Sequence, residues 1–289
     1  MASIKEYNKK LKSLKNTRKI TKTMKMVAAS KLHKAHQAQA NAKLYARNLT
    51  ELISRISAVV LPEQHPLLIK RQAVQNALIL VFTSDKGLCG AFNHNCHRHV
   101  VAWLKENRQN YKKVDLSFCG KRGYFFFRRM ENTKTYYENI VGDPKFESAI
   151  QIGNALIQSF LKTEYDEVYL AYNQFFSPIS QKTVFEKLLP IDPQAMIHEK
   201  IEHPREYLFE PQGPELLEFL IPHFVYFKIY FSLLENAAGE HGARMSAMDS
   251  ATKNATDFID KTTLLRNRAR QAAITTELTE IVAGAEALR

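Results

Sequence analysis

The chain is poor in cysteine and has no long apolar run. Cys89, Cys96 and Cys119 are its only cysteines among 289 residues, and so odd and sparse a set fits a reducing compartment better than a disulfide framework. No apolar run comes near the roughly 18 residues that cross a bilayer, and residues 1–10 carry charges where a secretory signal needs apolar side chains. These absences predict a soluble intracellular protein.

Proline is absent from both ends of the chain. All ten prolines lie between Pro62 and Pro222, and proline is the residue that most strongly breaks a helix interior. We therefore expect an N-terminal helix over residues 1–61, a central domain over 75–205 and a C-terminal helix over 212–289.

Acidic residues are scarce at the N-terminal end. Residues 1–60 hold 14 lysines and arginines but only Glu6 and Glu51 as acidic residues, a net charge of +12 that equals the net charge of the whole chain. The charges of the remaining residues therefore balance. A helix with this charge is expected to face an acidic partner or to be strongly solvated.

The apolar residues of both ends repeat at steps of three and four. In the N-terminal helix the series starts at Tyr7 and Leu11 and reaches Ile56, with alanines at its centre, and a similar series starts near Phe224. This narrow stripe predicts a coiled coil in which the alanines let the partner helix approach closely. The last turns, residues 274–288, are apolar with little charge, which predicts a tip that a partner covers.

The central segment alternates strands with helices. Apolar runs predict strands over 77–83, 114–119, 134–140, 168–173 and 181–188, and helices over 92–107, 122–130 and 147–162. That alternation is typical of a small α/β domain with a mostly parallel, Rossmann-like sheet. The expected fold class is therefore α/β plus long helices.

A glycine-containing turn follows the first expected strand. Residues 87–90 (Gly-Leu-Cys-Gly) open a helix at the place where nucleotide-binding sheets hold phosphate. Their spacing matches neither the dinucleotide motif G-x-G-x-x-G nor the phosphate loop G-x-x-x-x-G-K-[ST], which favours a tight structural turn. Nothing in the sequence pairs Cys89 with a base, so we interpret it as a small buried residue and not as a nucleophile.

One short segment gathers residue types that bind metals. His94, Cys96, His97 and His99 lie close together, and His94 and His97 would share one helix face. A second cluster of ligands is missing, which favours solvent-facing histidines without a metal. The sequence alone leaves metal binding at this cluster open.

The basic helix allows a second functional class. Its lysines and arginines could bind nucleic acid, which would make the chain a basic coiled-coil adaptor. They are spread over several helical faces and lack an aromatic stacking platform, so a solvated or protein-facing helix is favoured. A third class, a small nucleotide-using enzyme, would rest on the central domain.

Three motifs stand out, at residues 16–32 (NTRKITKTMKMVAASKL), 84–90 (SDKGLCG) and 268–281 (RARQAAITTELTEI). In this order they resemble the gamma subunit of bacterial F-type ATP synthases. The resemblance covers the whole chain and implies a rotor that couples proton flow to ATP synthesis. In that family the terminal helices wind as an antiparallel coiled coil inside a ring of alpha and beta subunits, and the α/β domain sits on the membrane ring. Catalysis then lies on other chains, with no cofactor or metal on this one.

The same resemblance implies contacts with partner subunits. The helices would meet the catalytic subunits, with Arg270 and Gln271 hydrogen-bonded to an acidic loop, and a foot would meet the c-subunit ring and the epsilon subunit. The implied contacts are Lys22, Met24 and Lys25 on the first helix, Arg270, Gln271, Thr275 and Glu277 on the last, and Tyr207 and Glu210 in the foot. The complex would lie peripherally at the cytoplasmic face of the bacterial inner membrane, with no nucleic acid bound.

The chain also departs from the family pattern. Gly239 and Gly242 stand where the family usually has Ser or Ala, and each weakens a helix by roughly 0.5–1 kcal/mol relative to alanine, so a soft point is expected there. Arg266 stands at a position where an aromatic residue is common in the family, so the packing contact of that aromatic residue is not expected here. The cysteine-bearing insert of chloroplast versions is missing, so thiol control of rotation is not expected. The sequence does not specify the coupling ion, protons or sodium, or how strongly epsilon inhibits.

Overall fold

The computed structural model describes residues 3–57, 65–192 and 213–286. The chain divides into two compact units, residues 29–243 and residues 1–28 with 244–289. Helix α1 (Ile4–Ser57) and helix α5 (Gly213–Glu286) each contribute to both units. The units are described one at a time below.

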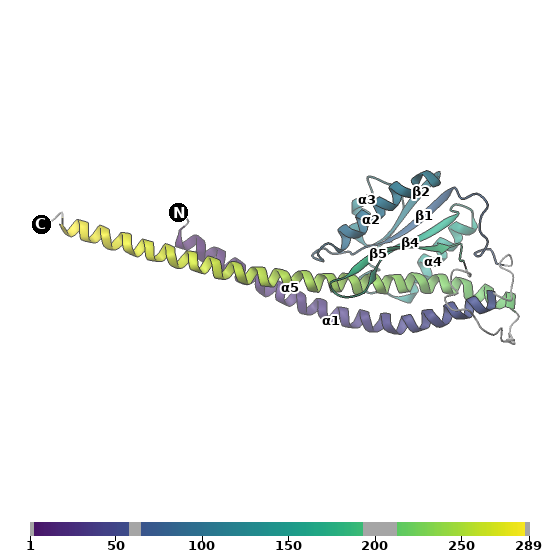
Figure 1. Ribbon diagram of the computed structural model, residues 1–289, viewed down its shortest axis with the longest axis horizontal. Helices are drawn as coiled ribbons and strands as arrows, with labels where there is room; N and C mark the ends of the chain where they lie inside the picture. Colours follow the sequence, from purple (N-terminus) through teal and green to yellow (C-terminus); the bar gives the residue numbers. More distant parts are fainter. Residues whose placement is uncertain (1–2, 58–64, 193–212, 287–289) are drawn as a thin grey trace. The chain divides into compact units, whose positions relative to one another are not determined.

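The larger unit is built around a five-stranded sheet (Figure 1). In space the strands follow the order β3-β2-β1-β4-β5, in which β1 to β4 run parallel and β5 runs antiparallel to β4. The predicted α/β domain with a mostly parallel sheet is thus confirmed. The strands are β1 (Asn76–Phe82), β2 (Lys113–Cys119), β3 (Thr133–Tyr137), β4 (Glu167–Phe175) and β5 (Gln181–Leu189).

Helices cover both faces of this sheet. Ile79 and Val81 of β1 belong to an apolar cluster with α2 and α3, whereas Leu80 and Phe82 belong to a second cluster with α4 and α5, and all four side chains are fully buried (Figure 1). A parallel strand buried on both faces reads as a continuous apolar run, which explains the sequence of β1. The helices are α2 (Phe92–Asn107), followed by the short 3-10 helix η2 (Arg108–Asn110), α3 (Lys121–Phe127) and α4 (Phe146–Leu161).

Two elements end earlier than the sequence predicts. The expected helix over 122–130 stops at Phe127, because the Met130 amide then donates to the Phe127 carbonyl in a tight turn at 2.8 Å. The expected strand over 134–140 stops at Tyr137, because Asn139 takes a positive φ of 57° that leaves the extended conformation.

Within the larger unit, α1 and α5 lie against each other in opposite directions. Gln39 of α1 meets Glu235 of α5, and further along α1 the Tyr45 hydroxyl meets His223 Nε2 at 3.0 Å while its ring packs on Phe227 at 4.7 Å between centroids. Contacts that move forward along α1 move backward along α5, so the pair is antiparallel. This confirms the expected pairing of the terminal helices.

The smaller unit is a second stretch of the same antiparallel pairing. The Thr252 hydroxyl donates to the Thr21 hydroxyl at 2.8 Å, and Lys25 binds Asp249 at 2.6 Å. The buried apolar residues of this unit are Leu11, Ala28, Met248, Ala255 and Ile259.

The C-terminal end of α5 has no covering helix within the smaller unit. Residues 271–285 are exposed except for the partly buried Ala273, and α5 continues past the first turn of α1 (Figure 1). The hydroxyls of Thr275, Thr276 and Thr279 donate to backbone carbonyls four residues earlier at 2.8 to 3.0 Å. The exposed apolar side chains on this tip are Ile274, Leu278, Ile281 and Val282.

Gly239 and Gly242 serve close packing. A Cβ at Gly239 would lie 3.0 Å from the Phe92 ring, and a Cβ at Gly242 would lie 3.0 Å from Pro178 Cα and 3.1 Å from the Phe175 ring. α5 runs through both positions without interruption. The structure thus gives these glycines a role that the expected soft point does not include. Gly239 lets Phe92 of α2 approach α5 closely, and Gly242 does the same for the end of β4 and the loop after it.

One described helix is apolar enough over Glu215–Ala285 to cross a membrane by length and composition, with a mean hydropathy of 1.3 in its most apolar stretch. Half of that stretch is buried inside the fold, however. The apolar character of α5 therefore has an explanation within the protein, since α5 supplies much of the core beneath α4.

Burial of His97 gives a pH prediction. His97 stacks on Phe126 at 4.3 Å between centroids, and burial, with a smaller contribution from His94, lowers its pKa from 6.5 to about 4. Between these values the unfolded chain binds more protons, so stability falls as the pH drops. We expect a loss of about 1.5 kcal/mol between pH 6.5 and about pH 5.

Urea unfolding across this pH range measures that loss. His97→Leu removes one titrating group and should reduce the dependence, leaving the part that comes from His65, whose pKa burial also lowers. The matched control His99→Leu, at an exposed position on the same helix, should keep the full dependence. An equal slope in wild type and His97→Leu would contradict the assignment.

Candidate functional site

The glycine turn is held in shape by hydrogen bonds between the residues on either side of it. Leu88 and Gly90 take positive φ values of 62° and 59°. The side-chain Nδ2 of Asn93 donates to Ser84 Oγ at 2.7 Å and to Cys89 Sγ at 3.2 Å. Asn93 Oδ1 accepts from the backbone amide of Ser84 at 3.0 Å. Cys89 is buried, which confirms its interpretation as a small buried residue. The turn therefore positions α2.

The histidine and cysteine cluster on α2 is dispersed. The Cys96 thiol is buried and donates to the Phe82 carbonyl at 3.6 Å, and burial raises its pKa to about 12. His99 Nδ1 lies 2.8 Å from the Asn95 carbonyl of its own helix. Across residues 3–57, 65–192 and 213–286, no three His, Cys, Asp or Glu side chains gather where they could hold a metal ion.

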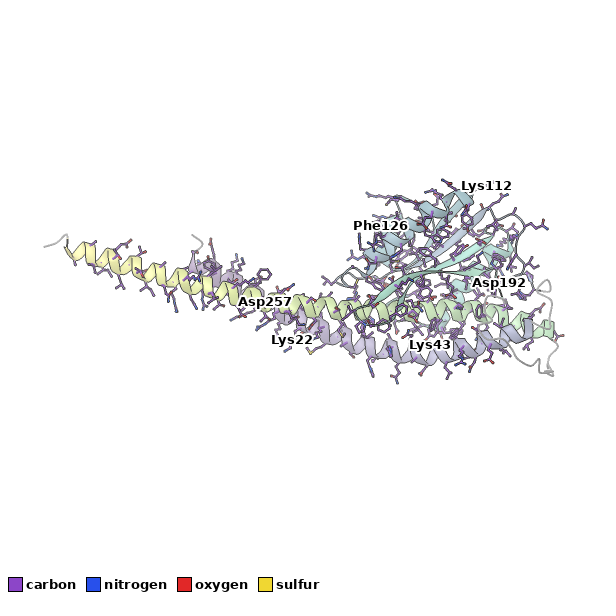
Figure 2. The ribbon with its side chains drawn as sticks, viewed as in Figure 1. Lys22, Lys43, Lys112, Phe126, Asp192 and Asp257 are labelled. Atoms are coloured by element: carbon purple, nitrogen blue, oxygen red, sulfur yellow. The ribbon has the colours of Figure 1, made fainter. Side chains whose placement is uncertain are left out.

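The predicted contact residues on α1 differ in their availability. Lys22, labelled in Figure 2, is exposed, and Met24 is half-buried. Lys25 is partly covered because its ammonium binds Asp249 of α5. Lys22 is thus the residue of the three that a partner could reach without breaking an internal contact.

The Lys25–Asp249 pair gives an electrostatic prediction. The hydrogen bond from Lys25, followed by the one from Lys253, holds the pKa of Asp249 below its ordinary 3.8. The contribution of this pair to stability is therefore present above pH 3.8 and is lost as the pH falls through the lowered pKa. Lys25→Met is expected to raise the pKa of Asp249 towards its ordinary value.

Carboxyl-carbon NMR titration measures this pKa directly. Lys19→Met, which removes an exposed lysine of the same helix, is the matched control and should leave the titration of Asp249 unchanged. An unchanged pKa in Lys25→Met would assign the whole effect to Lys253.

The predicted contact residues on α5 all lie on the exposed tip. Arg270, Gln271, Thr275 and Glu277 are exposed, and the Thr275 hydroxyl donates to the Gln271 carbonyl at 3.0 Å. In the part of the chain that the structure describes, no ion pair involves Arg270, so its guanidinium can form a two-pronged bond with an outside carboxylate. The tip combines these polar groups with the apolar side chains described above.

The predicted foot contacts cannot be placed in the same way. Tyr207 and Glu210 lie outside the described residues.

Sequence reasoning missed a buried polar contact between the helices. Gln39 Nε2 donates to Glu235 Oε1 at 2.7 Å, and both residues are buried. The available signal was an acidic residue in an otherwise apolar stretch of α5, but its partner lies 196 positions away along the chain.

Comparison with known proteins gives matches along the whole chain. A protein-family model described as ATP synthase matches residues 3–288. The chain is 42% identical over 289 residues to the ATP synthase gamma chain of Geobacter sp. (strain M21) and 41% identical over 295 residues to that of Bdellovibrio bacteriovorus, with 100% of each chain covered in both cases.

Solved structures are similar too. A chain from the central stalk and c-ring of the Tetrahymena thermophila mitochondrial ATP synthase matches with a TM-score of 0.57 at 27% identity, covering 80% of this chain and 99% of that one. A chain from the Euglena gracilis mitochondrial ATP synthase matches with a TM-score of 0.65 at 21% identity, covering 99% and 94%, which is a likeness of fold.

Proposed function

This chain belongs to the gamma-chain family of ATP synthases, and we propose that it works in the complex as a non-catalytic shaft. As a member of that family it is the central-stalk rotor subunit of an F-type ATP synthase. The shaft consists of α1 and α5, and the catalytic sites lie on other subunits. The observation that carries the proposal is the antiparallel pairing of these helices, which recurs in both units.

Two paired helices suit a rotating element. A single helix bends easily, whereas two helices joined along a seam resist bending and twisting together. The exposed lysines of α1 let acidic surfaces of a surrounding ring pass at small cost, because solvated ion pairs contribute only about 0 to 1 kcal/mol each and exchange readily. Nothing in the fold favours the nucleic-acid adaptor.

We infer that the catalytic subunits contact the shaft at two places. One is the α1 surface around Lys22 and Met24, next to the Lys25–Asp249 pair. The other is the tip of α5, where Arg270 and Gln271 would hydrogen-bond an acidic loop and Thr275 and Glu277 would lie beside it. The exposed apolar side chains of the tip would turn in an apolar bearing of the alpha and beta ring.

The remaining partners follow from the same proposal. The foot at Tyr207 and Glu210 would meet the c-subunit ring and the epsilon subunit. The chain would then associate with the cytoplasmic face of the bacterial inner membrane peripherally, through the complex and without a membrane span of its own.

Isolation of the tagged chain from native membranes tests this proposal. Mass spectrometry should find the alpha and beta subunits, epsilon and the c-subunit in fixed proportion to the chain. Recovery of duplex DNA without these subunits would support the adaptor, and ATP turnover by the isolated chain would support an enzyme. Either result would overturn the proposal.

A further inference from the structure

A buried carboxylate lies where α1, α5 and the loop between β4 and β5 meet. The Glu235 side chain is 4% exposed, and both of its oxygens accept hydrogen bonds. Oε1 accepts from Gln39 Nε2 of α1 at 2.7 Å, and Oε2 accepts from the backbone amide of Phe175 at 2.6 Å. One side chain of α5 is therefore joined by directional bonds to the opposite helix and to the sheet.

Small apolar residues lie beside this carboxylate, together with buried polar residues of α5 such as Ser232 and Asn236, whose side-chain amide donates to the Thr83 carbonyl at 3.2 Å. Ala38 and Ala42 of α1 and Ala237 and Ala238 of α5 belong to the buried or partly buried apolar residues near this level. Small side chains let helices approach closely, and the four alanines themselves provide no protruding group that resists sliding, so at this level resistance comes from the polar contacts, whereas further along α1 it comes from the Tyr45 ring on Phe227. A shift by one heptad, about 10 Å at 1.5 Å per residue, would again place apolar residues opposite apolar residues.

The contact between the loop and α1 adds little to this resistance. His36 touches the Phe175 ring edge-on, with 6.0 Å between centroids. Beside it an open groove of about 380 Å³ lies between α1 and the loop, lined by Leu32, His33, Phe176 and Pro178 among others. Packing alone therefore leaves room for the loop and α1 to shift relative to each other.

A buried polar pair in a coiled coil commonly fixes register at some cost in stability. We propose that Gln39 and Glu235 form a register key, which prevents α1 and α5 from sliding past each other and, through the Phe175 amide, fixes the sheet to the same register. The use of the key, to keep the two helices aligned under torque, rests on the proposed rotor function. The alignment itself is a property of the chain alone.

The test measures register in the full chain. Spin labels on Lys43→Cys and Glu218→Cys, both exposed positions in the larger unit, report the relative position of α1 and α5, and the three native cysteines are buried away from the label. Pulsed electron resonance should give one distance for the wild-type background. Gln39→Leu is expected to add a second distance, displaced by up to about 10 Å.

A swapped variant separates the key from general stability. Gln39→Glu alone places two carboxylates, those of residues 39 and 235, opposite each other. Gln39→Glu combined with Glu235→Gln restores an amide-to-carboxylate bond and leaves the amide oxygen of residue 235 to accept from the Phe175 backbone amide. We expect two distances in the single variant and one in the swapped variant. Lys228→Met, which breaks the partly buried pair with Glu186 instead, should keep one distance.

Several outcomes would overturn the inference. A single unshifted distance in Gln39→Leu and in Gln39→Glu would show that apolar packing alone sets the register, and a second distance in Lys228→Met would show that any lost contact loosens the pair. Within the assembled complex, Gln39→Leu should lower proton pumping per ATP hydrolysed. The spin-label distances are measured on the isolated chain and need no partner subunit. They therefore test the register key separately from the proposed function, which a failure of the wild-type chain to join the complex would overturn.

Discussion

Arg270→Ala is expected to lower ATP synthesis by the assembled complex by about tenfold. A hydrogen bond from a guanidinium to a carboxylate contributes roughly 1.5–3 kcal/mol, and about 1.4 kcal/mol corresponds to a tenfold change. Arg270 is exposed and forms no ion pair with the described residues. Its loss should therefore leave the fold of the isolated chain intact and weaken only the proposed contact with an acidic loop of the catalytic subunits.

ATP synthesis in membrane vesicles under an imposed proton gradient measures this effect. Arg268→Ala removes the same charge from an exposed position two residues away, on another face of the helix, and should keep most of the activity. Gln271→Ala should resemble Arg270→Ala, because both side chains are proposed to bond the same acidic loop. Unchanged synthesis in both Arg270→Ala and Gln271→Ala would remove these residues from the contact with the catalytic subunits.

Gly120→Ala is expected to destabilise the larger unit by about 3 kcal/mol or more. Gly120 takes a φ of +111°, which side chains with a Cβ rarely adopt, and an added Cβ would lie 2.4 Å from the Thr83 carbonyl oxygen. Such backbone strain costs of order 1–3 kcal/mol, and overpacking adds about as much. The clash cannot be relieved locally, because Thr83 Oγ1 is also bonded to the Gly120 carbonyl and the Gly123 amide.

Urea unfolding of the full chain, followed by the fluorescence of Trp103 in the larger unit, measures this loss. Gly142→Ala is the matched control, since a Cβ there meets nothing within 4 Å, and its effect should stay within about 0.5 kcal/mol. Equal midpoints for the two variants would mean that the Gly120 turn relaxes without cost.

Local patterns were enough to predict most of the secondary structure. A run of apolar residues predicts β1, and the absence of proline from both ends of the chain predicts α1 and α5. The order of the strands was beyond such patterns, because the central place of β1 depends on which strands pair across the sheet, as β1 does with β4. For the same reason the antiparallel direction of β5 appeared only in the structure.

The candidate site was predictable in a different way. Composition and periodicity identified α1 as basic and the end of α5 as apolar, and the exposure of Ile274 and Leu278 bears this out. The particular contacts at Arg270 and Glu277 came from resemblance to a family, since nothing in an isolated chain encodes the surface of its partner. The pairing of Lys25 with Asp249 was not foreseen, because it depends on how the two helices are aligned.

The threonines on the tip of α5 affect how strongly the tip would resist turning against a surrounding surface. Because the hydroxyls of Thr275, Thr276 and Thr279 are bonded to their own helix, these residues turn methyl groups outward and offer no free donor to a neighbour. A surface that forms no strong bond with its neighbours at any rotation angle has no angle at which it preferentially stops. Rotation past successive subunits would then meet low and nearly equal barriers, and angle-dependent attraction would be confined to the few charged side chains beside the threonines.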